Sequence, residues 1–402
     1  MIKRVSDERF GVYLHIPFCL QRCRYCDFFS TEGKWKLIPA YVAALIMEVR
    51  IAGRAGARPP VGSVYFGGGT PSLLAPAQLE EILGELRRSF ALAGDVEITL
   101  EANPKTTDRE QLAGYRAAGV NRLSLGIQSA DDAELRMLGR IHQFADTSQV
   151  YDDARRAGLE NINLDLIFGL PGQTPAGWSH TLDRALTLAP EHISIYSLTL
   201  EPGTELARQV RCGALPEPEE DAAADMYELA GEKLAAAGFR QYEISNWARD
   251  GGRAGGVFPR FACRHNLQYW RNLPYIGLGA GAHGCAGGRR YANIRSVEKY
   301  IARMRSPRDR RFPMTAAATI NRIRSREDEI RETMWLGLRL TDAGVSRAEF
   351  RGRFDEDYCD RFRKEIDESV AEGLLEWVQE RDRLRLTERG RLLGNRVFAR
   401  FV

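Results

Sequence analysis

Residues 11–29, GVYLHIPFCLQRCRYCDFF, join a short apolar segment to three closely spaced cysteines. The segment 11–16 is rich in aromatic and aliphatic residues, a composition typical of a buried strand. Cys19, Cys23 and Cys26 follow it with the spacing C-x3-C-x2-C. Three thiolates on one loop can surround a single inorganic centre, so we expect this loop to carry the chemistry of the protein.

Five further strand patterns alternate with helical patterns as far as residue 200. The strand patterns lie at 63–66, 96–102, 121–127, 161–168 and 192–200. Apolar residues recur at helical spacing between them, for example at 76–90 and 107–119. Alternating βα units predict a parallel sheet, and about eight of them would close a barrel. We therefore predict an α/β fold, an incomplete (β/α)6 TIM-like barrel, with the cysteines at the end that holds the active site in such barrels.

The pattern changes near residue 240, and we expect three parts of the chain: a partial barrel at 1–248, an extension at 249–313 and a C-terminal domain at 314–402. The extension opens with a Gly- and Arg-rich loop at 249–261. Its last segment, 301–313, is typical of a linker or an exposed connection because it is dense in arginine (Arg303, Arg305, Arg308, Arg310 and Arg311).

The C-terminal part resembles a winged-helix-like α+β domain. Helical patterns at 327–340 and 346–373 precede a hairpin at 374–387 and a last helix at 388–400. Winged helices often bind DNA, but acidic side chains in the presumed recognition region oppose a phosphate backbone (Asp355, Glu356, Asp357, Asp360, Glu365 and Asp367). We expect a packing or lid domain and no nucleic-acid partner.

The composition is that of a globular protein able to build a core: 402 residues, 44% apolar and 28% charged, with a net charge of +3. The longest apolar runs are shorter than the ~20 residues that span a bilayer, and the N-terminus shows no signal-peptide pattern. We expect a cytoplasmic location and leave peripheral membrane contact open. Seven cysteines are too few for a disulfide scaffold.

Two kinds of metal centre suit clustered cysteines. Zinc commonly takes four ligands in two separated pairs, whereas the remaining cysteines here are scattered singly (Cys212, Cys263, Cys285 and Cys359). Three thiolates on a four-iron cluster leave one iron open to a small molecule. The spacing therefore favours a 4Fe-4S cluster over zinc.

Polar residues and glycines gather at the ends of the other strands. The sequence GGGT at 67–70 follows the second strand, and its glycines let the backbone approach a ligand closely. Glu101 and Gln128 end the third and fourth strands, Asp165 lies within the fifth, and Arg140 is suited to pair a carboxylate. Each residue taken singly also fits a structural role, but together on one rim they indicate a polar ligand.

These segments carry a family resemblance. The three-cysteine motif, GGGT, EANP at 101–104, SLGIQS at 124–129 and LDLIFGLPGQT at 164–174 resemble the radical S-adenosylmethionine (SAM) superfamily. The pattern is most similar to the branch of oxygen-independent coproporphyrinogen III oxidase and its haem-chaperone relatives, from about residue 10 to 400. The resemblance implies a 4Fe-4S cluster on the three cysteines. It also implies one or two SAM molecules in contact with Tyr13, Tyr25 (through its backbone), Gly68, Gly69, Thr70, Glu101, Gln128, Arg140 and Asp165.

A second motif lies at 265–270, HNLQYW. The resemblance associates it with haem binding in the chaperones, with His265 as an axial ligand on a surface distinct from the cluster. Imidazole is a common haem ligand, and Tyr269 and Trp270 offer flat apolar area. The alternative is a hydrogen-bonded histidine beside core aromatics. By resemblance, GLGAGAHG at 277–284 places His283 near a cofactor, as a SAM neighbour or a second haem ligand.

Two features separate the chain from the oxidase. Asp27-Phe28-Phe29 follows Cys26 where the oxidase has a further cysteine, and only 18 residues precede Cys19, without the oxidase's long N-terminal arm. We expect a haem chaperone without coproporphyrinogen oxidase activity, which passes haem to acceptor haemoproteins. Oxidative decarboxylation of coproporphyrinogen III is the alternative, and a radical SAM enzyme acting on RNA is a weaker third hypothesis. The resemblance also implies a homodimer and acceptors among respiratory membrane enzymes.

Overall fold

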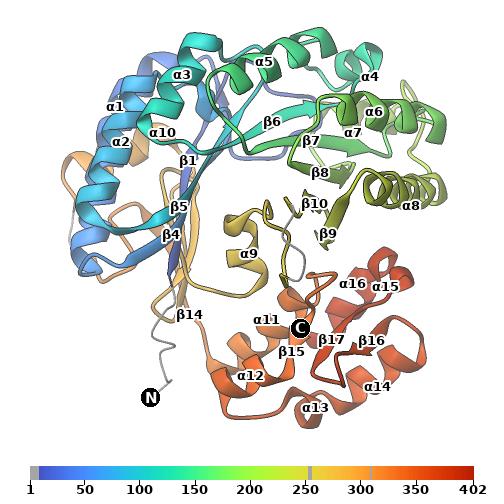
Figure 1. The fold of residues 1–402 in the computed structure, drawn as a ribbon. Helices are drawn as coiled ribbons and strands as arrows, with labels where there is room; N and C mark the ends of the chain where they lie inside the picture. Colours follow the sequence, from blue (N-terminus) through green and yellow to red (C-terminus); the bar gives the residue numbers. More distant parts are fainter. Residues whose placement is uncertain (1–8, 252–255, 308–309) are drawn as a thin grey trace.

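A twelve-stranded sheet organises the larger part of the molecule (Figure 1). The computed structural model describes residues 9–251, 256–307 and 310–402. Six strands run parallel in chain order, which confirms the predicted partial barrel. They are β1 (Phe10–Ile16), β4 (Pro60–Gly68), β5 (Ala91–Ala102), β6 (Arg122–Gln128), β7 (Ile162–Phe168) and β8 (His192–Ser197).

The two faces of these strands differ in character because side chains alternate across a sheet. One set is apolar and buried, for example Leu14, Phe66 and Leu164, and forms the main core. The helices cover this outer face (Figure 1). They are α1 (Ile38–Ala55), α2 (Pro76–Ser89), α3 (Arg109–Ala118), α5 (Phe144–Arg156), α6 (Pro175–Thr187) and α8 (Glu220–Ala236). The short helices α4 (Asp132–Met137) and α7 (Glu205–Arg211) pack instead near Tyr25 of the cysteine loop and Ile167. The inner face carries polar and aromatic side chains instead.

Short strands extend the sheet at both edges. On the β8 side lie β10 (Asn246–Arg249) and β9 (Phe239–Glu243), both antiparallel to their neighbours. On the β1 side, β11 (Tyr275–Leu278) adds a further parallel strand, which the sequence patterns did not predict. The antiparallel strands β12 (His283–Ala286), β13 (Arg289–Asn293) and β14 (Ala318–Ile323) follow it. The large sheet thus continues past the boundary predicted at residue 313.

The cysteine loop between β1 and α1 contains only short elements. They are β2 (Phe18–Cys19), β3 (Thr31–Glu32) and the 3-10 turn η1 (Trp35–Leu37), while η2 (Pro71–Leu73) follows β4. β2 and β3 pair with each other and fold the loop back on itself.

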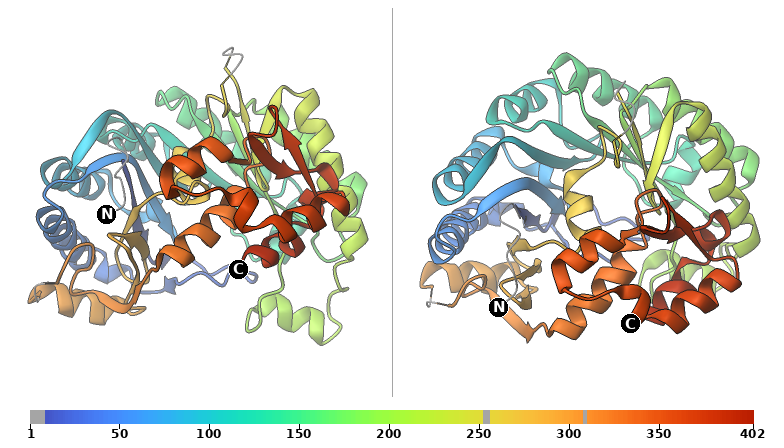
Figure 2. Two further views of the ribbon diagram at one scale, coloured as in Figure 1. Left: turned by 90° about the horizontal axis from the view of Figure 1, so that it is seen from below. Right: turned by 60° about the horizontal axis from the view of Figure 1, so that its bottom comes forward.

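The short helix α9 (Arg264–Trp270) lies on the inner side of the curved sheet, where it contacts β1 and β4 (Figures 1 and 2). The C-terminal domain stands at the open side of the barrel (Figure 2). A sheet of only six βα units leaves this side open, and α9 and the C-terminal domain occupy it.

The C-terminal domain has its own core, from Ile330 to Phe401. Its helices are α11 (Arg326–Gly337), α12 (Arg347–Phe354), α13 (Tyr358–Arg361) and α14 (Arg363–Ala371), and its sheet contains β15 (Val345–Ser346), β16 (Leu375–Val378) and β17 (Arg383–Leu386). The predicted helices and hairpin are present. The predicted last helix is broken into α15 (Glu388–Leu392), α16 (Gly394–Phe398) and η3 (Ala399–Phe401).

The prediction of a linker at 301–313 is wrong for its first part. Residues 301–305 belong to helix α10 (Val297–Arg305), which packs on α1. Ile301 and Met304 are buried there, while Arg303 and Arg305 face outward. Charge density suggested a solvated linker, but the arginines occupy only the outer face of an amphipathic helix. Residues 1–8, 252–255 and 308–309, with Arg308 and part of the Gly- and Arg-rich loop, lie outside the described residues.

No helix among the described residues is long and apolar enough to cross a membrane.

Candidate functional site

A cavity of about 500 Å³ opens at the carboxyl ends of the parallel strands. It brings together most of the residues predicted from the sequence. Its walls include Cys19, Cys23, Tyr25, Cys26, Gly68, Gly69, Thr70, Glu101, Gln128, Arg140 and Asp165. These residues come from the cysteine loop and from four strands or the loops that follow them, because all parallel strands end at the same rim.

The three cysteines are free thiols on one side of this cavity. Thr70 Oγ1 lies 3.6 Å from Cys19 Sγ, and Arg140 Nη1 lies 3.2 Å from Cys23 Sγ. Burial raises the pKa of Cys19 and Cys26 above the ordinary thiol value. Both thiols therefore hold their protons until a metal displaces them, whereas neighbouring hydroxyl and guanidinium donors suit the thiolate form. Three thiols with such donors fit the cysteine ligands of an iron–sulfur cluster.

The glycines at the end of β4 are required by the close packing of this strand end against β1 and the start of the cysteine loop. Gly68 has φ +115°, and a Cβ there would lie 2.5 Å from His15 Cε1. A Cβ on Gly69 would lie 2.7 Å from the carbonyl oxygen of Phe18. Packing alone therefore requires glycine at both positions, whether or not a ligand binds. The absence of side chains also leaves backbone groups open to the cavity.

Two carboxylates face the cavity from the strands. Glu101 accepts hydrogen bonds from the Tyr65 hydroxyl at 2.8 Å and from the Gly68 amide at 3.1 Å. Asp165 accepts from Ser124 Oγ and Asn163 Nδ2, each at 2.9 Å. Burial, with the nearby charge of Asp165, raises the pKa of Glu101 to about 7. Burial also raises the pKa of Asp165. A positively charged ligand would favour the ionised form of both groups.

Arg140 connects the strand side of the cavity to the cysteine loop. Its Nη2 donates to the carbonyl of Gly126 at 2.7 Å and to Asn103 Oδ1, while Nη1 reaches Cys23. The adjacent Gln128 is buried at φ +59°, and its Oε1 has no hydrogen-bond partner among the described residues. A buried acceptor without a donor is costly, so Gln128 suits a ligand that donates to it.

Tyr13 and His265 lie outside the set that lines the cavity. Tyr13 is below it, stacked on Tyr65, and its hydroxyl lies 3.0 Å from His15 Nδ1. The ring of His265 stacks on Tyr65 with centroids 5.1 Å apart. Tyr65 therefore stands between the α9 motif and Glu101 in the cavity wall.

His265 is a buried, fully hydrogen-bonded histidine in this conformation. It is 1% exposed, with Nδ1 2.9 Å from Ser63 Oγ and Nε2 2.9 Å from the Tyr269 hydroxyl. Burial, followed by the charge of Arg122, lowers its pKa to about 3, so the ring is neutral. His283, by contrast, is exposed at the start of β12 and does not line the cavity.

Several cavity residues were missed from the sequence. Tyr65, Asn103, Ser124 and Tyr196 line the same cavity. Tyr65 and Ser124 could have been found from strand alternation, because each lies two residues before a glycine of the inner face and so points the same way. Asn103 is part of the EANP segment, where only the glutamate was singled out.

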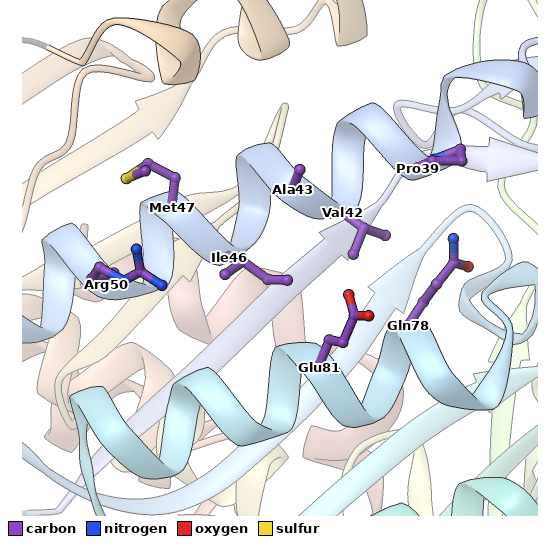
Figure 3. Close-up of a pocket in the computed structure, with 8 residues that line it drawn as sticks. All are labelled: Pro39, Val42, Ala43, Ile46, Met47, Arg50, Gln78 and Glu81. Carbon is purple, nitrogen blue, oxygen red and sulfur yellow. The ribbon is translucent and has the colours of Figure 1, made fainter.

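A second hollow of about 430 Å³ lies between α1 and α2, on the helical exterior of the barrel (Figure 3). Figure 3 shows Val42, Ile46 and Arg50 of α1 facing Gln78 and Glu81 of α2. It contains no cysteine and none of the predicted site residues.

Two family models match the chain. Residues 13–185 match the Radical SAM superfamily, and residues 325–393 match the HemN C-terminal domain. The chain is 37% identical to "Heme chaperone HemW" of Bacillus subtilis (strain 168), over 98% of this chain and 99% of the relative. The chain belongs to the HemW family. Relatives in this family include HemW of Escherichia coli (strain K12), 35% identical over 98% of both chains.

Similarity extends to eukaryotes and to solved structures. The chain is 38% identical to "Radical S-adenosyl methionine domain-containing protein 1, mitochondrial" of Mus musculus, over 92% of this chain and 82% of the relative. Its fold matches the structure of coproporphyrinogen III oxidase (HemN) from Escherichia coli with a TM-score of 0.82, over 99% of this chain and 91% of the other, at 24% identity. The match supports the predicted α/β fold, a partial barrel followed by a C-terminal α+β domain.

Proposed function

We propose that this chain is a haem chaperone that holds a 4Fe-4S cluster and SAM in the barrel and transfers haem to acceptor haemoproteins. The observation that carries the proposal is the convergence of three free thiols, two half-buried carboxylates and Arg140 on one cavity, in a chain that matches curated haem chaperones over nearly its whole length.

Cys19, Cys23 and Cys26 would hold the cluster, which leaves one iron open to SAM when it is bound. Glu101 and Asp165 offer negative charge to the positive groups of SAM, and Gln128 offers an acceptor. Arg140 holds the cysteine loop against the strand rim through Cys23 and Gly126. Tyr25 lines the same cavity from the cysteine loop.

Haem ligation by His265 requires a change at α9. Both ring nitrogens have partners, so an iron bond would replace the contact to Ser63 or to Tyr269. Trp270 marks the end of α9, and the guanidinium carbon of Arg339 from the C-terminal domain lies 4.5 Å from its ring centroid. We propose that α9 leaves its place in the barrel when His265 binds haem.

The decisive experiment is direct haem transfer. The protein, reconstituted anaerobically, is loaded with haem and mixed with an apo-haemoprotein, and transfer is followed by the shift of the Soret band. The wild type should transfer haem, and His265→Ala should show an altered Soret band and slower transfer with unchanged cluster content. An unchanged spectrum and rate in His265→Ala would remove His265 as the ligand.

The same preparation tests the alternative. Anaerobic incubation with coproporphyrinogen III, SAM and a reductant should release no decarboxylated product. Turnover of coproporphyrinogen by a wild-type protein that binds no haem would replace the chaperone proposal with the oxidase.

A further inference from the structure

Arg122, at the start of β6, is a buried cation inside the barrel. Its side chain is 2% exposed, yet it has no ion pair or side-chain hydrogen bond to another described residue, and its Nε is buried without an acceptor. A buried charge without a partner is costly unless it offsets charge of the opposite sign nearby.

Strand register places Arg122 among the carboxylates of the inner face. Arg122 is opposite Thr99 on β5, so Glu97 and Glu101, two residues to either side, share its face. On β6 itself, Ser124 is two residues further toward the cavity and donates to Asp165 of β7. Arg122 thus lies one layer beneath Glu101, Ser124 and Asp165, directly under the cavity floor.

Within the part of the chain that the structure describes, Glu97, Glu101 and Asp165 accept hydrogen bonds only from neutral donors. Glu97 accepts from the backbone amides of Arg264 and His265 at 3.0 and 3.1 Å. Glu101 and Asp165 accept from hydroxyl and amide groups. Arg140, a half-buried cation that lines the cavity, directs its Nη groups to Gly126, Asn103 and Cys23. Arg122 is therefore the positive charge that acts from below on the cavity carboxylates.

We propose that Arg122 is a positioning residue that keeps Glu101 and Asp165 ionised, so that they attract the positive groups of SAM. The inference rests on the proposed function, since it assumes that SAM occupies this cavity. Arg122 itself lies beneath the cavity and does not line it.

The charge balance supports this role. Burial raises the pKa of Glu101 and of Asp165, and the guanidinium of Arg122 opposes the rise in both cases. The other titratable groups that this charge faces are Tyr65 of β4, Glu97 of β5, His192 of β8, Tyr242 of β9, and Cys263 and His265 at α9. The neutral Tyr65 hydroxyl donates a hydrogen bond to Glu101, and burial keeps both histidines neutral. Among these titratable groups, Arg122 carries the positive charge that favours the ionised forms of Glu101 and Asp165.

Loss of Arg122 should change how SAM binding depends on pH. Without the guanidinium, the pKa of each carboxyl rises further. Glu101, whose pKa already lies at about 7, then takes up a proton at neutral pH, and SAM loses part of the attraction. Raising the pH removes this proton and restores binding. Loss of Arg122 should therefore move the pH midpoint of SAM binding toward alkaline values, which a merely structural role would not do.

The test measures SAM binding by equilibrium dialysis with labelled SAM between pH 6 and pH 9, on cluster-reconstituted protein. Arg122→Gln should bind SAM about tenfold more weakly at pH 7 and recover at high pH, a midpoint shift of roughly one pH unit. Arg122→Lys keeps the charge and should follow the wild type. An unchanged midpoint in Arg122→Gln, or a lysine variant that behaves like the glutamine variant, would overturn the proposal.

A double variant keeps the test informative. In an Asp165→Asn background, the second change Arg122→Gln should have a smaller effect, because one of its target carboxylates is gone. A full effect in that background would count against the electrostatic role. If the wild type binds no SAM at any pH, the proposed function fails rather than the role of Arg122. Cluster absorbance and circular dichroism check that each variant is folded.

Discussion

At the scale of single residues, the cavity depends on contacts between side chains far apart in the sequence. Arg140 reaches Cys23 Sγ on the cysteine loop and the Gly126 carbonyl on β6. Glu101 is held by Tyr65 and by the Gly68 amide. Of these two networks, the one around Arg140 includes a cysteine, whereas the one around Glu101 does not.

The cysteines provide the first prediction. Replacing Cys19, Cys23 or Cys26 with Ala should strongly reduce iron content and the broad visible absorbance after anaerobic reconstitution, since each supplies a cluster ligand. Cys212→Ala is the control, because Cys212 is exposed after α7 and outside the cavity. Full cluster content in the triple variant would show the assignment to be wrong.

Arg140 and Asp165 should differ in their effects. Asp165→Asn removes a charge that faces the cavity without touching a cysteine, so it should weaken SAM binding about tenfold and leave iron content unchanged. Arg140→Ala should weaken SAM binding and also lower cluster content, because it loses the contact to Cys23. Calorimetry with SAM and iron determination separate the two. Equal SAM affinity in Asp165→Asn and the wild type would remove Asp165 from the site.

At the scale of elements, a close backbone contact stabilises the edge of the sheet, and ion pairs connect two of the outer helices. β11 and β12 approach so closely that a Cβ on Gly277 would lie 1.9 Å from the carbonyl oxygen of His283. On the exterior, Glu85 of α2 accepts from Arg50 of α1 at 2.9 Å and from Arg88 at 3.0 Å. The approach of β11 to β12 leaves no room for a side chain at position 277. The contact between α1 and α2 depends on the charge of Glu85.

Gly277→Ala should lower the free energy of unfolding by about 3 kcal/mol or more, since the obstacle is backbone that cannot rotate away. Gly231→Ala in α8 is the matched control. A Cβ there meets nothing within 4 Å, and alanine is the better helix former by roughly 0.5–1 kcal/mol. Urea unfolding compares the two, and similar midpoints for both variants would contradict the predicted clash.

Glu85 should make stability depend on pH. Its bond to Arg50, with further help from Arg88 and Ser89, lowers its pKa from 4.5 to about 2. A lowered carboxyl pKa stabilises the fold above the unfolded value of 4.5, and this contribution is lost as pH falls toward 2. Glu85→Gln should cost about 1–2 kcal/mol at neutral pH, after allowance for solvent around the arginines. Urea unfolding should show that the difference shrinks in acid, and a pH-independent difference would exclude the ion pair as its cause.

At the scale of the whole molecule, the C-terminal domain secures the chain that follows α9. Arg353 Nη2 donates to the Asn272 carbonyl at 2.9 Å and forms an ion pair with Glu329 at 2.6 Å. Asn272 Nδ2 donates to Thr333 Oγ1 at 2.9 Å and to the Glu329 carbonyl at 3.2 Å. If α9 leaves the barrel as proposed, these contacts would have to loosen, because they hold the residue that follows Arg271 to the C-terminal domain.

Arg353→Ala should loosen this connection. Hydrogen exchange of residues 264–272 should become faster, while cluster content stays at the wild-type level because the cavity is at the other end of the barrel strands. Arg363→Ala is the control, since the Arg363–Asp360 pair is exposed within the C-terminal domain. Identical exchange at 264–272 in the wild type and Arg353→Ala would show that the domain does not restrain α9.

The parts of the molecule that the sequence predicted are those with a local signature. Six strands, the cysteine loop and the wing hairpin each have a run of residues with a characteristic period or spacing. The ends of parallel strands meet at one rim, so Glu101, Gln128 and Asp165 could be assigned to one cavity before any contact was known. Arg140 belonged to the same set only through the resemblance and its charge.

Other features depended on burial between distant segments, which no local pattern contains. The HNLQYW motif is short and amphipathic, and only the folded barrel decides that His265 is enclosed between Ser63, Tyr65 and Tyr269. Arg122 resembles an ordinary polar residue at the start of a strand until the register places it beneath two carboxylates. Strand β11 is four residues long and is stabilised by the β1 edge rather than by its own composition. Periodicity along the chain thus predicts the strands and helices, and the order of the parallel strands predicts which residues meet at the rim. The balance of charges inside the barrel is decided only by the tertiary structure, because it depends on which groups are buried away from water next to one another.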